Sequence, residues 1–584
     1  MTRILLITSL VLYCVGYPVG AANYTYNPSQ AASINSRTFA AGDVLTLQNG
    51  DWNDKNITIK GNGNSSAPIL VKAETAGKVV FKGASRLTMD GKYIEVEGIE
   101  FSGNSTVGTS HVVTFSRNSS HCRLTNSAIR NYNPPNSTSW ASTDNKWISI
   151  NGTHNRVDHC YFENKGNIGT LLVVWLVGGQ SANHRIDNNH FYKRVPLLDG
   201  NQKELNGQET IRIGDSSTSL TDANCIVENN FFEECDGEIE IISNKSCGNT
   251  YRNNVFFNNN GTLTLRHGNA CTVEGNYFIG RNQSGTGGVR IIGENHRIYN
   301  NYFQDLLGSG YRTAICIVKG KRNSALNEYF QVKNTLVAFN TFYNCANAFN
   351  VGYDGGNDLA PVSTTIAHNV VFAKNTNQTG VRVSDSRSEI TWANNLMYQG
   401  RHRDFTPTET QFRRTMTNLN FQLTDTEYGI QQPTSNSAIA TEYTTMDYSD
   451  ISLDIEGRTR PNRKMIGAFE LMGNATLAMP TPQTAGCSFI NKEGATGMVF
   501  VEAFEKGESL IDRISIRNKI LSVQAAVGEL KLQVYDLKGV LQFDSSLGSG
   551  HPNFVFDLSV LPTGLHLLVF ETENRKDARK IIVQ

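Results

Sequence analysis

Residues 225–231 read Cys225-Ile226-Val227-Glu228-Asn229-Asn230-Phe231, and the recurrence of this pattern decides the fold. Each copy has polar and apolar residues, then asparagine, then an aromatic residue. The commonest interval is roughly 22 to 30 residues, which lies in the range of solenoid repeats. Further copies occupy residues 184–191, 251–256 and 271–278, and others end at Phe303, Phe342 and Phe372.

The repeat unit is rich in β-branched and aromatic residues and is too short for a helix-turn-helix repeat. It therefore predicts an all-β chain folded as a right-handed parallel β-helix. Asparagines at the bends are expected to hydrogen-bond from coil to coil in a ladder. A leucine-rich repeat lacks support because its leucine spacing is missing, and a β-propeller, the less favoured alternative, needs longer repeats.

The ends of a solenoid need caps because an open coil exposes sheet edges. Residues 28–35 are expected to form a short N-terminal cap helix, and the coils to begin at residues 43–47. The final rungs are expected near residues 465–470. We assign residues 22–472 to the β-helix domain, which carries the candidate catalytic residues.

The first 21 residues resemble a signal peptide. Arg3 supplies positive charge, residues 4–15 form a short apolar run, and Val19-Gly20-Ala21 provides small residues for cleavage. Since no later segment is long and apolar enough to span a membrane, the protein is expected to be exported, whether secreted, periplasmic or on the cell surface.

Lysine plus arginine (53) equals aspartate plus glutamate (53), which gives no support for a nucleic-acid partner. Of the ten cysteines, Cys14 lies in the predicted leader. The remaining nine show no C-x-x-C pair and no zinc-like spacing. Burial in a repetitive core is therefore favoured over a disulfide framework, and oligomeric state is left open.

After the solenoid, residues 473–507 are predicted to form a linker rich in Ala, Thr, Gly and Pro. Residues 508–584 change character, and residues 532–539 and 561–570 are typical of strands in a small β-sandwich. This part resembles the C-terminal sorting domain of type IX secretion substrates in Bacteroidetes bacteria. A generic sandwich module is the alternative.

The strongest chemical signal lies at residues 236–245. In an extended strand Glu238 and Glu240 share one face while Ile239 and Ile241 share the other, so we expect the isoleucines inside and the carboxylates outside. Two adjacent glutamates favour a positive partner, and a hard cation with oxygen ligands suits them.

Basic residues follow on neighbouring coils. Lys245 comes just after the carboxylates, and Arg266 and Arg212 are predicted to face outward beside inward leucines and isoleucines. Together they suit the removal of a proton from the carbon next to a carboxylate. Taken singly, each of these charges is more often solvated surface, and His267 is more often a hydrogen-bonded rung histidine. Glu209 lies two residues before Ile211, so its side chain should point inward as Ile211 does; we expect it at a bend or bonded to its neighbours, with help to the metal as the lesser alternative.

Three blocks in this order, residues 206–214, 238–246 and 265–268, resemble polysaccharide lyase family 6, which includes alginate lyases and chondroitinase B. The likeness spans roughly residues 25–470. The resemblance implies a calcium ion as cofactor, with Asn206, Glu238 and Glu240 as its ligands. It also implies Lys245 as the catalytic base, Arg266 as the acid or charge stabiliser, and substrate binding by Arg212. From its place beside Arg266, His267 is a candidate for substrate binding by neutralising substrate charge.

The resemblance implies a lyase that cleaves an acidic polysaccharide by β-elimination and leaves 4,5-unsaturated oligosaccharides. Glu209-Thr210 is similar to the alginate-active members, so mannuronate-rich alginate is the preferred substrate. Dermatan sulfate is the runner-up and would call for further basic residues, for which the candidates are Arg290, Arg312, Lys319, Arg401 and Arg403. A β-helix glycoside hydrolase would instead need paired carboxylic acids, and a non-catalytic polysaccharide-binding solenoid would form no product.

Overall fold

The computed structural model describes residues 21–490, apart from 354–355, 426 and 445–446. Beyond residue 490 it describes segments 502–503, 513–517, 520–524, 529–535, 541–548, 553–558, 561, 564–571 and 576–583. The chain divides into two compact units, with the boundary near residues 482–490. Nearly all of the predicted signal peptide lies outside the described residues.

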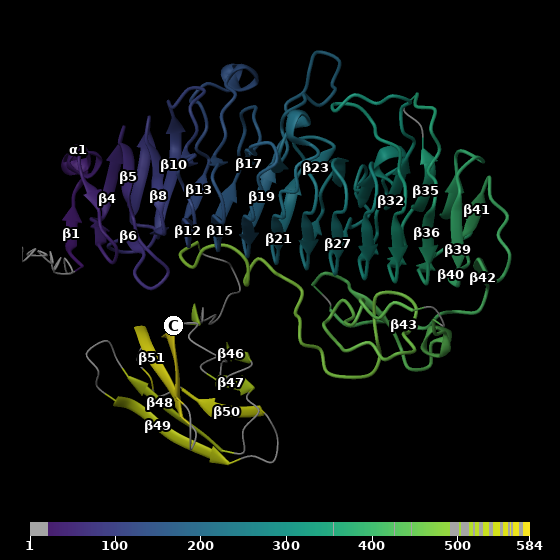
Figure 1. Ribbon diagram of the computed structural model, residues 1–584. Coiled ribbons are helices and arrows are strands. Elements are labelled where there is room, and N and C mark those ends of the chain that lie inside the picture. The colour runs from purple at the N-terminus through teal and green to yellow at the C-terminus, as the bar shows by residue number, and fades with distance from the viewer. Residues whose placement is uncertain are drawn as a thin grey trace, which may run out of the picture. The chain divides into compact units, whose positions relative to one another are not determined.

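The first unit is a solenoid of three parallel sheets with fourteen strands each (Figure 1). One coil consists of β21 (Ile226–Glu228), β22 (Phe231–Cys235) and β23 (Glu240–Lys245), and each strand pairs with its counterpart in the next coil. This confirms the predicted all-β, right-handed parallel β-helix.

The paired asparagines explain why the repeat bends where it does. Asn229 has φ 55°, a left-handed conformation that asparagine tolerates. Asn230 is fully buried, and its Nδ2 donates to Oδ1 of Asn254 at 3.0 Å. The expected coil-to-coil ladder is confirmed, and its members are Asn189, Asn230, Asn254, Asn276, Asn301, Asn340, Asn369 and Asn395.

Aromatic residues of most repeats form a second ladder inside the solenoid; in the copy at residues 225–231 the ladder residue is Phe232, one position after the end of that motif. Neighbouring rings stack with centroids 4.6–5.1 Å apart, which matches the spacing of adjacent strands. Its members are Phe162, Phe191, Phe232, Phe256, Phe278, Phe303 and Phe342. The nine cysteines after the leader are all buried and free of disulfides, as expected.

The predicted N-terminal cap is confirmed. The 3₁₀ turn η1 (Pro28–Gln30) leads into α1 (Ala31–Asn35), and Ile34 is fully buried against the first coils. Asn27 caps the turn by accepting a hydrogen bond from the backbone of Ser29.

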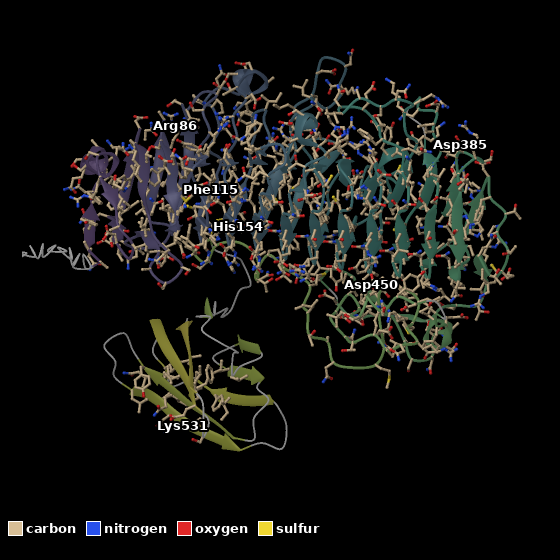
Figure 2. The ribbon with its side chains drawn as sticks, viewed as in Figure 1. Arg86, Phe115, His154, Asp385, Asp450 and Lys531 are labelled. Carbon is tan, nitrogen blue, oxygen red and sulfur yellow. The ribbon has the colours of Figure 1, made fainter. Side chains whose placement is uncertain are left out.

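The prediction for the last rungs was wrong. The sheets end at β41 (Arg401–Arg403) and β42 (Phe412–Thr415), not near residues 465–470. The later apolar residues pack on the outside of the coils instead, where the Ala468 N–H donates to Thr341 at 2.9 Å. Asp450 of the same returning chain, labelled in Figure 2, forms an ion pair with Arg297.

Residues within the first half of the predicted linker 473–507 also contact the solenoid. The N–H groups of Gly486 and Ser488 each donate a 2.7 Å hydrogen bond, to Asn188 and Asn126. The exact domain boundaries stay predictions.

The second unit contains two antiparallel sheets, of five and three strands. Within it, β48 (Glu529–Tyr535) and β51 (Gly564–Glu571) overlap the two strands predicted from sequence. Among the described residues, no helix has the length and apolar character needed to cross a bilayer.

Candidate functional site

The expected site residues come together on adjacent strands of one sheet. Strand β20 (Ile211–Ile213) pairs with β23, and β23 pairs with β26 (Thr262–His267). The register aligns Arg212 with Ser243 and Thr264 across the three strands. Because neighbouring parallel strands lie about 4.8 Å apart, residues from three coils share one short surface.

Lys245 lies opposite His267, one position beyond Arg266. The offset arises because the pairing of β23 with β26 is irregular between Asn244 and Lys245. Lys245 and Arg266 therefore belong to neighbouring rungs, as expected, but they do not form a direct cross-strand pair.

The simple alternation expected for the glutamates and isoleucines was wrong. Strand β23 begins only at Glu240, and its register shifts between Glu240 and Ile242, so Ile241 and Ile242 are both buried. Ile239 is half-buried and lines a surface hollow instead of the core. Glu238 is only 6% exposed, so the first carboxylate is far less open than predicted.

Three carboxylates lie close together beneath this surface. Burial, and after it the negative charges of Glu209 and Glu240, raise the pKa of Glu238 to about 9. Glu209, expected at a bend, lies two residues before the start of β20 and is 2% exposed. A cation would relieve the repulsion within this group, because it favours the charged form of every carboxylate near it.

The expected calcium ligands fit that ion in their chemistry, since all three offer oxygen donors. Glu238 and Glu240 influence each other electrostatically, whereas Asn206 lies exposed in the segment before β20. Across the described residues, no group of three or more histidine, cysteine, aspartate or glutamate side chains is arranged to hold a metal ion. The supporting observation for a cation is therefore the raised pKa of the buried Glu238.

Lys245 is held by one of these carboxylates and still reaches the surface. Its amine lies 3.9 Å from Oε1 of Glu209, and its side chain is 21% exposed. The Thr170 hydroxyl donates to the other oxygen of Glu209 at 2.7 Å. The amine is thus directed by a buried partner while part of it stays open to a substrate.

Two arginines converge on Glu240. Arg266 Nε and an Arg290 NH group lie 3.7 and 3.5 Å from Oε1 of Glu240, respectively. Both guanidinium groups also lie over the ring of Tyr329, at 4.4 and 5.6 Å from its centroid. Positive charge is therefore concentrated here, where an anionic sugar can interact with it.

Arg212 lies over the ring of Trp175 at 5.1 Å, and its buried Nε has no hydrogen-bond partner. An unpaired buried donor of this kind is suited to an anionic ligand. His267 differs from the expectation of a charge-neutralising group. Burial, and then the positive charge of Arg266, lower its pKa to about 3, so the ring is neutral at neutral pH and contributes hydrogen bonds instead.

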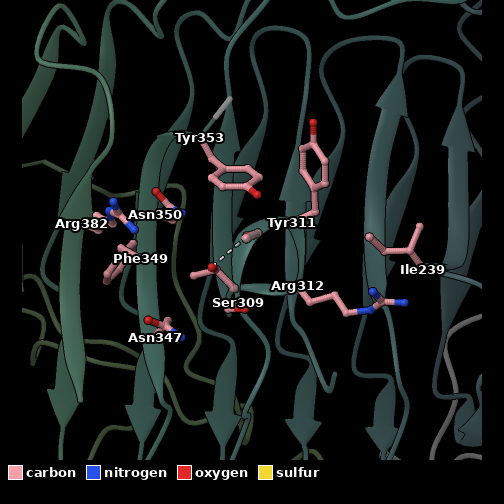
Figure 3. A pocket seen from close by; sticks show the side chains of 11 residues that line it. Ile239, Ser309, Tyr311, Arg312, Asn347, Phe349, Asn350, Tyr353 and Arg382 are labelled. Carbon is pink, nitrogen blue, oxygen red and sulfur yellow. Dashed lines mark hydrogen bonds between the residues drawn. The ribbon is translucent and has the colours of Figure 1, made fainter. Parts of the chain in front are cut away.

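The surface is hollowed on both sides of the site. On one side lies a cavity of about 390 Å³ over η4 (Gly310–Arg312) and β35 (Asn347–Tyr353), shown in Figure 3. Aromatic and polar side chains give it the character of a sugar-binding surface. They include Tyr311, Arg312, Asn350, Tyr353 and Arg382.

On the other side lies a cavity of about 710 Å³ over β11 (Val113–Phe115) and β14 (Ile148–Ile150), lined in part by Arg117 and Trp175. The order of strands in this sheet places β20, β23 and β26 between the two cavities. The site residues therefore lie midway along a row of hollows that suits a linear polymer.

Sequence reasoning missed the contributions of Trp175 and Tyr329 and did not place Arg290 at the centre. Arg290 carried a usable signal, because Val289-Arg290-Ile291 repeats the apolar-arginine-apolar pattern of residues 211–213. Tyr329 carried none, since it lies in a loop outside the repeat.

Comparison with known proteins agrees with this geometry. The family model for Chondroitinase B matches residues 33–449. The structure of the PL6 family alginate lyase AlyGC has 31% sequence identity and a TM-score of 0.68, and the match covers 80% of this chain and 59% of AlyGC. This chain therefore spans less than two thirds of that relative's length. A comparison with curated proteins gives no match.

Two shorter structures are covered almost completely. A mannuronic acid specific polysaccharide family 6 lyase from human gut microbiota has 32% identity and a TM-score of 0.61, with 68% of this chain and 91% of that chain covered. The PL6 family polysaccharide lyase Pedsa3628 from Pseudopedobacter saltans has 27% identity and a TM-score of 0.55, with 67% and 97% covered. The extent of the family match, together with these relatives, shows that the chain belongs to the chondroitinase B family.

Proposed function

We propose that this protein is an exported polysaccharide lyase that cleaves mannuronate-rich alginate by β-elimination. The observation that carries the proposal is the placement of Lys245 and Arg266 on paired strands, beside buried carboxylates and between two hollows. Support for the substrate comes from the relatives of 31% and 32% identity, which are described as an alginate lyase and a mannuronic acid specific lyase.

In this proposal the amine of Lys245 accepts the proton at C5 of the uronate. The bond between C4 and the departing oxygen then breaks as the C4–C5 double bond forms, and the departing oxygen takes a proton from water. Arg266 and Arg290 stabilise the negative charge that develops, and Arg212 binds a substrate carboxylate. Because arginine is very hard to deprotonate, Arg266 acts chiefly by its charge.

We also propose calcium as the cofactor, held by Asn206, Glu238 and Glu240. When bound, calcium would act as a Lewis acid that neutralises the uronate carboxylate and makes the C5 proton more acidic. The chain's own part is to supply the oxygen ligands and to keep Lys245 and Arg266 beside them.

Dermatan sulfate is the second candidate substrate. The matching family model is that of chondroitinase B, and Arg312 and Arg382 line the hollow in Figure 3. The sulfate groups of such a substrate would bind more tightly to a hollow that carries this positive charge. However, Arg312 already forms a salt bridge of 2.8 Å with Glu204, so it is less available to bind a sulfate group, which favours the unsulfated alginate.

The deciding experiment measures ultraviolet absorbance from the new double bond. Purified protein is given poly-mannuronate, poly-guluronate or dermatan sulfate in turn, and Lys245→Ala serves as the comparison. A rise on an alginate block that the variant lacks supports the proposal, and a rise on dermatan sulfate alone favours the second candidate. No rise on any polymer would reject a lyase and favour hydrolysis or simple binding.

Export remains part of the proposal, supported by the leader-like residues 1–21, and the C-terminal unit is proposed to serve sorting. Fractionation of the native host tests both. Full-length protein is expected outside the cytoplasm, and deletion of residues 508–584 should cause its retention.

A further inference from the structure

A loop outside the repeat pattern covers the guanidinium group of Arg266. The loop, residues 320–331, follows β32 (Ile315–Val318), and its backbone carbonyls at Glu328 and Asn327 accept hydrogen bonds from Arg266 at 3.0 and 3.3 Å. The Tyr329 ring lies 4.4 Å from the Arg266 Cζ. As a result, only 17% of the Arg266 side chain is exposed.

The same tyrosine also binds Arg290. An Arg290 NH2 group donates to the Tyr329 hydroxyl at 2.6 Å, while its Cζ lies 4.2 Å from the ring centroid of Tyr311. Arg266 and Arg290 both approach Oε1 of Glu240, so two like charges lie close together and repel each other. The negative face of a tyrosine ring and its hydroxyl oxygen offset part of that repulsion.

The loop has its own internal support. The Lys321 N–H donates to the Tyr329 carbonyl at 2.8 Å, and Lys321 forms an ion pair with Glu328. Gln331 donates to the Ala360 carbonyl at 2.7 Å, which ties the loop to a neighbouring segment. A loop bonded in this way holds Tyr329 in place before any substrate arrives.

We propose that Tyr329 is a positioning residue for the elimination: its ring fixes Arg266 and its hydroxyl fixes Arg290, so that both cations are oriented before the substrate binds. This inference rests on the proposed lyase function. Charge stabilisation is most effective when the stabilising groups need no reorganisation during the reaction. Tyr329 therefore acts through the arginines and affects turnover more than substrate binding.

The test compares Tyr329→Ala and Tyr329→Phe with wild type on the polymer that wild type cleaves. Tyr329→Ala should lower kcat by about 10- to 100-fold with KM changed less than about threefold, because a misplaced charge costs rate. Tyr329→Phe keeps the ring and should retain kcat to within about fivefold. The matched control is Tyr24→Ala, which removes a similar pair in the N-terminal cap, where Arg37 lies 4.5 Å from the Tyr24 ring.

Dependence on the arginine gives a second readout. In an Arg266→Lys background, Tyr329→Ala should cause less than about a fivefold further loss, since the residue that the ring positions is already gone and only the hydroxyl contact with Arg290 is left to lose. An unchanged kcat in Tyr329→Ala, full additivity in the double variant, or equal loss in Tyr329→Phe would each overturn the inference.

Crystal structures of wild type and Tyr329→Ala test the inference without turnover. The Arg266 guanidinium should move away from its wild-type position, and an unmoved guanidinium would overturn the inference. If wild type cleaves none of the three polymers, the proposed function fails by itself, while the crystal structures still decide the positioning role.

Discussion

The Lys245 amine lies 3.9 Å from Oε1 of Glu209, a carboxylate that is only 2% exposed. The second oxygen of that carboxylate accepts a hydrogen bond from Thr170 at 2.7 Å. Glu209 is therefore fixed by a partner of its own. It holds the lysine at the edge of the buried acidic group, where the amine faces the surface between the two hollows.

This placement predicts that Lys245→Ala abolishes most of the elimination. Loss of a positioned base costs about 10²- to 10⁴-fold in rate, so kcat should fall by that factor on the preferred polymer. Initial rates of ultraviolet absorbance check the value. Lys82→Ala, which removes a lysine paired with Asp51 on a distant coil, is the control and should keep its activity. Near wild-type activity in Lys245→Ala would show that the base lies elsewhere.

The raised pKa of Glu238 predicts how stability depends on pH when no divalent cation is present. With a folded pKa of about 9 and an unfolded value of about 4.3, the folded state binds more protons between those limits. The free energy of unfolding therefore falls as pH rises through this window. Glu238→Gln removes the effect, so it should melt a few degrees higher than wild type at pH 8 and about equally at pH 4. Thermal melts in a chelator test this, with the exposed Glu409→Gln as control.

Calcium should restore the folding stability that is lost when Glu238 is ionised. Adding calcium chloride at pH 8 is expected to raise the melting temperature of wild type, because the ion binds the folded state. Glu238→Gln should lose most of that rise, while Glu409→Gln should keep it. An equal rise in wild type and Glu238→Gln would place the bound ion away from this carboxylate. The chelator should also lower kcat if the ion takes part in turnover.

Regular features were predictable from the sequence, and irregular ones were not. The asparagine at position 230 recurs on successive coils, so a local pattern was enough to predict its ladder, whereas the stacking of the recurring aromatic rings was not predicted. The shift near Ile242 depends on how β23 pairs with β26, and no pattern within one coil records it. For the same reason the burial of Glu238 was missed. Tyr329 reaches the site through a loop, and loop conformation depends on contacts that the repeat does not encode.

His267 predicts a loss of stability in acid. Its folded pKa is about 3, against about 6.5 when unfolded, so the unfolded state binds more protons between these values. The stabilisation is complete above pH 6.5 and declines as pH falls toward 3. His267→Gln should therefore lose less stability than wild type between pH 7 and pH 4 in denaturant titrations. His154→Gln, at an exposed position, is the control, and equal losses in wild type and His267→Gln would contradict the prediction.

Arg212 offers a test of how the polymer is bound. Its guanidinium lies over the ring of Trp175, which lines the larger hollow, so this cation lies beside the proposed path of the polymer. Arg212→Ala should raise KM about tenfold while kcat changes by less than about threefold, since a contact present in both ground and transition states is lost. Raising the salt concentration should weaken polymer binding more in wild type than in the variant, because the variant has one fewer charge pair for salt to screen. Arg37→Ala, which removes the arginine stacked on Tyr24 in the cap, should leave both constants unchanged. A fall in kcat with KM unchanged would instead assign Arg212 to the chemical step.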